Sequence, residues 1–322
     1  MGALHTAYPR SPAISTTTAS RNLSKALRCV IRSLLAKDKE FLETHGTRRC
    51  WITLSPDEVA HYLKNHVAAL AGLYPATCDF TSMYTNLDHT VIKTNVRKAV
   101  MEAMKYGRNQ LPGLRAPAMY LVQDEDESVR WSRNSGPGLA LSMEDVFKHI
   151  DFIVDNTFLM TQDGTIRHQR IGLPMGTNAS PELANLTLYA TEAQYIDDLI
   201  QEGRIQEARQ HVHTKRFIDD LMTWNTLPPP SALYGLEWTA TTNEDRSATF
   251  LGITATPLNT GLQLGVFDKA ASWSFPVIRY PSPPVPHPMS QPTKQQVSIQ
   301  VSSPGTRAYV THGRPSSQLS SN

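Results

Sequence analysis

Apolar residues recur every three or four positions in several stretches of the chain, the spacing that one face of a helix requires. These stretches predict helices over residues 22–42, 55–70, 89–106 and 143–156. Ser55, followed by Pro56 and two acids, is typical of a helix start. A longer helix is predicted within residues 182–212, which contain helix formers, no Pro and a single Gly.

Other stretches alternate between apolar and polar residues, which is the pattern of strands. This alternation predicts strands over residues 236–242, 248–256 and 261–267. A short apolar run predicts a strand that ends near Asp79, and Asp163-Gly164 predicts a hairpin turn. Residues 111–138 follow neither pattern and are expected to be irregular. The mixture predicts an α+β fold, in which helices pack on one face of an antiparallel sheet.

Composition divides the chain into three regions. Residues 1–50 carry nine Lys or Arg against three Asp or Glu, a net charge of +6, whereas the whole chain carries +2. A basic helix there is suited to following a nucleic-acid backbone, although a solvated helix face explains the same pattern. Residues 51–281 contain the predicted folded elements. Residues 282–322 are rich in Pro, Ser, Gln and Thr without periodicity, which predicts a disordered tail.

Several classes of protein are disfavoured. No apolar run reaches the length of a membrane span, and the N-terminus lacks a signal-peptide core. We therefore expect a nuclear or cytoplasmic protein that is neither secreted nor membrane-spanning. Cys29, Cys50 and Cys78 are widely spaced, which argues against a disulfide framework or a zinc site. His211 and His213 form an HxH pair, but no nearby cysteine accompanies it.

Two adjacent carboxylates interrupt an apolar, β-prone segment at residues 214–224. They are Asp219 and Asp220. Burying neighbouring carboxylates costs several kcal/mol unless a partner offsets the charge, so at the tip of a hairpin they are suited to holding divalent ions. A second pair, Asp197 and Asp198, lies within the long predicted helix, and we interpret it as part of a solvated helix face.

Two further motifs precede this hairpin in the chain. In the first, Asp79 ends a short apolar stretch, and Tyr84 follows five positions later. The second is a Gly/Pro-rich turn at residues 171–181, in which Pro181 is well placed for the first turn of the long helix. The order is therefore a strand with one Asp, a Gly-rich turn with a helix, and a hairpin with two Asp.

In this order the three runs resemble motifs A, B and C of the reverse transcriptase palm, most closely in the retroelement branch that includes Penelope-like elements and is similar to telomerase catalytic subunits. Residues 20–25, 249–253 and 267–281 resemble flanking segments of that family, so the resemblance covers about residues 10–281. Of the Lys and Arg that grip the triphosphate in the family's fingers, Arg10 alone is a candidate. The resemblance thus implies an N-terminally truncated palm with partial fingers.

The resemblance implies that residues 1–50 are a remnant of the fingers and a connecting helix, and that residues 51–281 are the palm. It implies an RNA-directed DNA polymerase of a retroelement, with an RNA template, a DNA primer and deoxynucleoside triphosphates as partners. Such nucleotidyl transfer uses two Mg²⁺ ions, or Mn²⁺, held by hard carboxylate oxygens. Asp79 and Asp219 would be the bridging catalytic and metal ligands, with Asp220 beside them.

The resemblance also implies a nucleotide site. Tyr84 matches a steric gate that excludes a 2′-hydroxyl and so favours deoxynucleotides, although a half-buried packing role explains it too. Phe80 would place its backbone beside the triphosphate. Met175 and Gly176 would form the floor beneath the nascent base pair, or would simply belong to the turn at which a helix begins. Gln169 matches a polar position of the family, or is simply an exposed Gln.

A second function is open on sequence grounds. The reduced fingers, and the lack of a convincing thumb after Pro281, fit a catalytically impaired or domesticated palm that binds nucleic acid or a protein partner without synthesis. The intact acidic motifs favour the polymerase. The sequence leaves the oligomeric state open.

Overall fold

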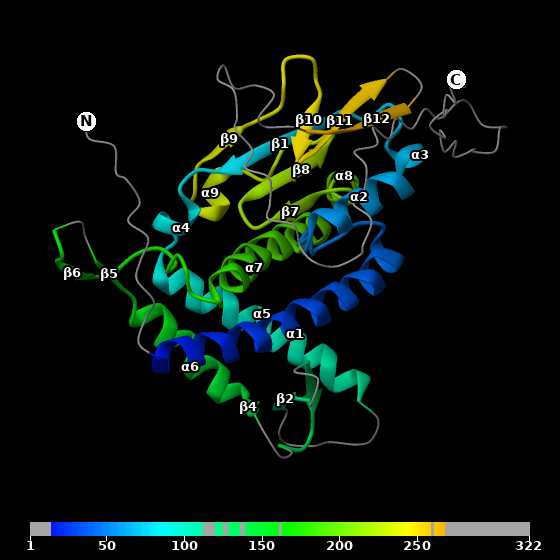
Figure 1. The fold of residues 1–322 in the computed structure, drawn as a ribbon. Helices are drawn as coiled ribbons and strands as arrows, with labels where there is room; N and C mark the ends of the chain where they lie inside the picture. Colours follow the sequence, from blue (N-terminus) through cyan, green and yellow to red (C-terminus); the bar gives the residue numbers. More distant parts are fainter. Residues whose placement is uncertain are drawn as a thin grey trace, which may run out of the picture.

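Antiparallel strands and long helices form separate layers in the computed structural model (Figure 1). The residues that the structure describes are 14–111, 120–124, 128–135, 139–160, 163–258 and 261–267. The central sheet has the strand order β7-β8-β1-β9, with antiparallel neighbours throughout. Its strands are β1 (Pro75–Phe80), β7 (Lys215–Phe217), β8 (Asp220–Trp224) and β9 (Trp238–Ala240).

Long helices lie beneath this sheet in Figure 1. They are α1 (Ile14–His45), α5 (His89–Gln110), α6 (Met143–Asp155) and α7 (Ser180–Gln201). Most residues of α7 between Ser180 and Leu199 are buried on every side of the helix. A helix that is buried all round belongs in the interior of a domain. Helix α7 is therefore the support on which the sheet, α1 and α5 pack.

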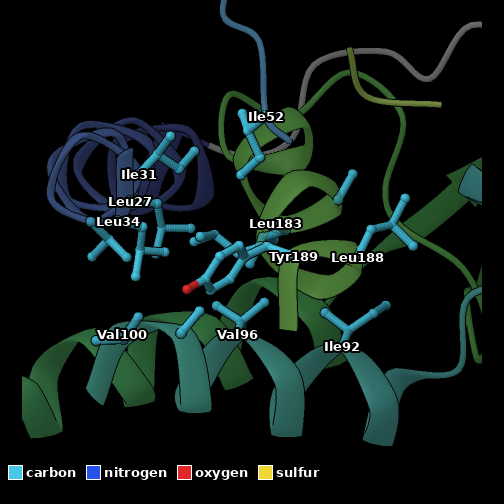
Figure 2. Close-up of a cluster of buried hydrophobic side chains, with 14 of the residues drawn as sticks. Leu27, Ile31, Leu34, Ile52, Ile92, Val96, Val100, Leu183, Leu188 and Tyr189 are labelled. Atoms are coloured by element: carbon cyan, nitrogen blue, oxygen red, sulfur yellow. The ribbon is translucent and has the colours of Figure 1, made fainter. Parts of the chain in front are cut away.

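Apolar side chains from three helices pack together in the main core (Figure 2). They include Leu27, Ile31 and Leu34 of α1, Ile92, Val96 and Val100 of α5, and Leu183, Leu188 and Tyr189 of α7. Within α1 and α5 these residues are spaced by three or four positions, which places them on one face of each helix. Burying each such side chain stabilises the fold by about 2 kcal/mol.

A second core lies on the opposite face of the central sheet. Met222 and Trp224 pack there against α2 (Pro56–Asn65) and α3 (Val67–Leu70). A three-stranded antiparallel sheet completes this core, with β10 (Ala248–Phe250), β11 (Ile253–Leu258) and β12 (Gly261–Val266). Because side chains alternate along a strand, Leu221 faces the first core and Met222 the second.

The remaining elements are short. A sheet of order β3-β2-β4 lies at the end of the helices far from the central sheet, and a hairpin of β5 and β6 projects from the body (Figure 1). These strands are β2 (Tyr120–Gln123), β3 (Val129–Ser132), β4 (Ala140–Ser142), β5 (Phe158–Met160) and β6 (Ile166–His168). The short helices are α4 (Met83–Asn86), α8 (Ile205–Gln210) and α9 (Ser231–Tyr234).

The outer edge of β7, on the side away from β8, pairs with the segment that precedes α2. Ile52 forms a parallel bridge with Arg216. The Arg216 N–H donates to the Trp51 carbonyl at 2.7 Å, and the Thr53 N–H donates to the Arg216 carbonyl at 2.8 Å. An N-terminal segment thus extends the central sheet beside the hairpin that carries Asp219.

The predicted α+β mixture of helices and antiparallel sheets is confirmed, as are the helices over residues 22–42, 89–106 and 143–156. Ser55 caps α2, since its side chain accepts the Glu58 N–H. Two other helix predictions are wrong at their ends. The predicted 55–70 helix breaks at His66, whose φ of −113° is not helical. The predicted 182–212 helix breaks at Gly203, where φ is 78°.

Two strand predictions are also corrected. Residues 248–256 form two strands, because Leu251 and Gly252 adopt positive φ values of 51° and 79° and reverse the chain. Within the supposedly irregular residues 111–138, β2 and β3 pair with each other, and β4 follows. These strands have only three or four residues, too few for a clear period in the sequence.

Some predictions lie outside the described residues. They concern Arg10, the segment 268–281 and the tail 282–322. Among the helices that the structure does describe, none combines the length and the apolar character needed to cross a bilayer.

Several basic residues of the N-terminal region are engaged inside the fold. Arg28 pairs with Glu182, Lys37 with Glu102, Arg48 with Asp38, and Arg49 with Glu102 and Asp197. The opposite side of α1 is buried in the main core. These charges therefore tie α1 and the following turn to α5 and α7, a role that neither sequence interpretation of the basic helix included.

Candidate active site

The pairing of β1 with β8 places Asp79 directly opposite Asp220. Directly opposed residues of antiparallel strands project from the same face of the sheet. Asp219 lies in the two-residue turn between β7 and β8, and its carbonyl accepts the Phe80 N–H at 3.1 Å. The structure thus brings together the three acids that were predicted from distant parts of the sequence.

The acids lie on the face of the sheet away from α7. Cys78 and Phe80, which flank Asp79, are buried in the core that α7 builds. Strand alternation therefore turns Asp79 and its partner Asp220 to the other face, where both are only half-buried. On the β9 side, Thr239 is opposite Asp79. The site is an acidic patch at the open end of a strand pair.

Burial makes the charged forms of Asp219 and Asp220 unfavourable, and the neighbouring carboxylates add to this effect. Burial raises the pKa of Asp220 to about 6, and the Asp219 and Asp79 carboxylates add to the rise. Burial, together with Asp79, also raises the pKa of Asp219, while Arg216 opposes that rise. Carboxylates with raised pKa values in a half-open position are typical of functional sites, although structural networks also produce them.

Oxygen donors from these three acids are the ligand type that Mg²⁺ prefers, and the ion needs few of them because it retains water. No group of three or more His, Cys, Asp or Glu side chains within the described residues is arranged to enclose a metal ion. The donor chemistry of Asp79, Asp219 and Asp220 fits Mg²⁺ or Mn²⁺, and the assignment of these ions stays a prediction.

Tyr84 lies beside the acidic patch, in the short helix α4 that follows β1. Its ring is half-buried, and burial raises its pKa to about 12, with further contributions from Asp219 and Glu182. Glu182 at the start of α7 is buried, and one of its carboxylate oxygens has no partner. The half-buried position predicted for Tyr84 is therefore present, and it adjoins the site. Its role as a steric gate stays a prediction.

The turn before α7 touches the backbone of α4. Gly172 has a φ of 86°, and a Cβ placed there would lie 2.3 Å from the Tyr84 carbonyl oxygen. The Leu173 N–H donates to the same oxygen at 2.7 Å. Only glycine allows this approach, and the consequence is a fixed distance between the turn and the segment that carries Tyr84.

The other predicted nucleotide residues lie in or near this turn. Met175 and Gly176 are exposed, and Gly176 has a φ of 96°. The Gln169 side-chain amide donates to the Ile171 carbonyl at 2.9 Å and more weakly to that of Leu173, so it braces the turn. The Phe80 N–H is already used by Asp219, and the Phe80 ring packs on Tyr234. The nucleotide contacts of these residues stay predictions.

The projecting hairpin exposes apolar side chains next to the turn. Phe158 is 56% exposed and Ile166 is 69% exposed, and the Phe158 ring stacks on His168 at 5.0 Å. Arg167 and Arg170 are exposed on the same segment. Exposed rings beside basic residues are typical of surfaces on which nucleic-acid bases stack.

The second Asp pair is not equivalent to the first. Asp197 was predicted to be solvated, but it is half-buried and accepts the Arg49 guanidinium at 2.5 Å. That part of the prediction is wrong, because α1 brings Arg49 against α7. Asp198 is exposed as predicted and accepts a hydrogen bond from the Gln194 amide at 2.7 Å.

His211, the first residue of the HxH pair, is buried against Trp51, and burial lowers its pKa to about 4.

Sequence reasoning missed two residues beneath the acidic turn. Arg216 and Glu192 are both fully buried and face each other at 2.5 Å. The available signals were a cation within an apolar strand and an acid among the apolar residues of a long helix. Neither signal identifies its partner, because the two residues come from separate elements.

No protein-family model matches this chain, and no curated protein matches it at a significant level. Among solved structures it is similar to apo telomerase from Candida tropicalis, with 13% identity and a TM-score of 0.44 over 70% of this chain and 38% of that one. Telomerase from Candida albicans with a fragment of telomeric RNA is 11% identical, with a TM-score of 0.45 over 77% of this chain and 40% of that one. The Candida tropicalis telomerase with such a fragment is 14% identical, with a TM-score of 0.49 over 80% of this chain and 39% of that one. The chain spans less than half the length of these structures, and no activity follows from similarity at this level.

Proposed function

We propose that this chain carries the catalytic palm of an RNA-directed DNA polymerase of the retroelement type. The observation that carries the proposal is the register of β1 and β8, which sets Asp79 opposite Asp220 and beside Asp219. Strand pairing alone does not require carboxylates at these positions, and their proximity raises the energy of the charged forms of Asp219 and Asp220. A divalent cation would remove that cost.

Asp79, Asp219 and Asp220 hold two Mg²⁺ ions in this proposal. When bound, such ions would lower the pKa of the primer 3′-hydroxyl and offset the charge of the leaving pyrophosphate. The residues of the chain fix the positions of these carboxylates. The bond from the Phe80 N–H to the Asp219 carbonyl joins the two acidic segments, so that ligands from both are held at one distance. Positioning of this kind carries much of the catalysis in phosphoryl transfer.

Tyr84 selects the sugar in this proposal. It lies in α4, directly after the strand that carries Asp79, and Asp219 is close enough to contribute to its raised pKa after burial. The close approach of Gly172 and the bond from the Leu173 N–H both fix the Tyr84 backbone. A ring carried on this fixed backbone would exclude a 2′-hydroxyl, so deoxynucleotides are favoured.

In this proposal the RNA template and DNA primer bind beside the acidic patch, near the turn before α7. The exposed Phe158 ring, stacked on the half-buried His168 with Arg167 and Arg170 nearby, suits an unpaired template strand, since stacking and phosphate contacts need no particular sequence. Met175 and Gly176, on the adjacent turn, contact the base pair that forms.

Primer extension on an annealed RNA template tests the proposal, with Mg²⁺ and deoxynucleotides supplied. Asp219→Asn and Asp220→Asn are compared with Asp198→Asn, a matched exposed carboxylate of the second pair on α7. We expect extension by the wild type and by the Asp198 variant, and its loss in the other two. A folded wild type that binds primer and template but extends nothing would support the alternative, a domesticated palm. Equal activity in all the variants would refute the site.

A further inference from the structure

A buried hydrogen-bond network lies directly beneath the acidic turn, between β7 and α7. Arg216 is its centre. Its Nε and Nη2 donate to Glu192 at 2.5 and 3.1 Å, and its Nη1 donates to the Asn185 side chain at 2.9 Å. Nη2 also donates to the Asn185 carbonyl at 3.1 Å. Every one of these partners lies on α7.

One further bond leaves α7 and reaches the turn. Arg216 Nη1 donates to the Ile218 carbonyl at 2.9 Å. Ile218 is the first residue of the two-residue turn, and Asp219 is the second. The guanidinium therefore joins α7 to the turn. Because it bonds the Ile218 carbonyl, this link does not depend on the side chain at position 218.

The turn needs such support because its backbone is strained. Ile218 has a φ of 57°, a region that β-branched residues rarely adopt. Strain of this kind persists only where the surroundings hold it, and it is common at functional sites. Two consecutive carbonyls of the turn are held, that of Ile218 by Arg216 and that of Asp219 by the Phe80 N–H.

A stability role alone does not account for the network. A buried ion pair contributes little net stability, since desolvation of both charges offsets their attraction, and apolar residues of similar volume often serve as well or better. Arg216 and Glu192 occupy a site surrounded by apolar core, where such a replacement would pack. The feature that an apolar pair would lack is the donor to the Ile218 carbonyl.

We propose that Arg216 is a positioning residue for Asp219, which it holds at a fixed place relative to α7 through the Ile218 carbonyl. Glu192 and Asn185 orient the guanidinium. This inference rests on the proposed function, because it assigns the consequence of the bond to the ligand that Asp219 provides. It concerns the turn, whose conformation can be measured without catalysis.

The test is the double variant Arg216→Met/Glu192→Met, which replaces the buried pair by apolar side chains. Its matched control is Arg204→Met/Glu207→Met, an ion pair exposed on the surface near α8. Three readouts are compared for each protein: the unfolding temperature, hydrogen exchange of peptides containing Ile218 and Phe80, and the kcat and KM for primer extension.

We expect the buried double variant to stay folded at the assay temperature with a lowered unfolding temperature, because Asn185 and the Ile218 carbonyl lose a donor. It should exchange faster at the turn and lose up to about 100-fold in kcat, with the deoxynucleotide KM changed by less than about twofold. The control should match the wild type in all three. Unchanged exchange at the turn together with retained kcat would overturn the proposal, as would a loss of kcat explained by a matching loss of folded protein.

Arg216→Lys provides a second route if the double variant does not fold. Lysine keeps the charge but cannot reach both Glu192 and the Ile218 carbonyl. Faster exchange at the turn in this variant is expected, and unchanged exchange would refute the role. If the wild type extends no primer while the turn exchanges faster in the variants, the polymerase proposal fails and the positioning role stands.

Discussion

Neutralising Asp220 should stabilise the fold, and the size of the effect follows from its surroundings. Burial and two neighbouring carboxylates raise its pKa from the ordinary value of 3.8 to about 6. The folded state thus binds the proton more tightly than the unfolded chain does. Stability contributed by this proton is present at low pH and is lost as the pH rises from 3.8 towards 6.

A shift of this size would cost about 3 kcal/mol above that window if the carboxyl were fully shielded from solvent. Asp220 is only half-buried, so solvent screening reduces the expected cost to roughly 1 kcal/mol. Asp220→Asn removes the charge and keeps the shape. It should therefore raise the unfolding temperature at about pH 8 by about 2–4 °C, a change suited to a domain of this size.

Thermal unfolding is measured in a buffer without divalent cations, for the wild type and Asp220→Asn, at about pH 8 and about pH 4. The difference should be present at the higher pH and should vanish at the lower one, where the wild-type carboxyl is protonated. Asp198→Asn, on the exposed face of α7, should show no such dependence. A variant that is less stable than the wild type at the higher pH, or a difference independent of pH, would refute this account of the crowded carboxylates.

Three further predictions follow from close contacts. Gly172→Ala should destabilise the fold by about 3 kcal/mol or more in urea unfolding, because its Cβ would meet the Tyr84 carbonyl oxygen at 2.3 Å and its φ is 86°. A loss below about 1 kcal/mol would show that the turn can move away. Gly107→Ala brings a Cβ to 2.6 Å from the Trp131 ring, and this clash should exceed the gain of about 1 kcal/mol that alanine brings to a helix. Unfolding followed by fluorescence checks this, and a Gly107→Ala variant more stable than the wild type would contradict it. Tyr84→Ala should lower the discrimination between deoxynucleotides and ribonucleotides by about 10-fold or more in primer extension, and unchanged discrimination would exclude the steric gate.

Elements with a long, clear period could be predicted from the sequence. Helices α1, α5 and α6 each bury one regular face, so their spacing alone defines them. The acidic hairpin was also predictable, because Asp219 and Asp220 stand out within an apolar run. The opposition of Asp79 to Asp220 was not, since register depends on which strands become neighbours.

Features that depend on partners from other elements could not be predicted. Arg49, in the segment after α1, pairs with Asp197 of α7 only in the folded chain, so a half-buried carboxylate could not be expected there from local pattern. The role of Arg216 in supporting the turn can be recognised only once β7 and α7 are placed together. The close approach at Gly172 has the same origin, because the turn before α7 and the short helix α4 meet only in the folded chain.

The bridge between Ile52 and Arg216 has a consequence for the order in which the protein is built. The segment that covers the edge of β7 leaves the ribosome long before the hairpin does, and α7 and β1 also precede the hairpin. These are non-local contacts, which form slowly because a long loop must first close. The acidic turn can therefore be assembled only after β1, α7 and the hairpin have all been synthesised. A nascent chain that ends before β8 would lack Asp220 and the strand that pairs with β1, and it would leave the apolar face of α7 exposed to aggregation.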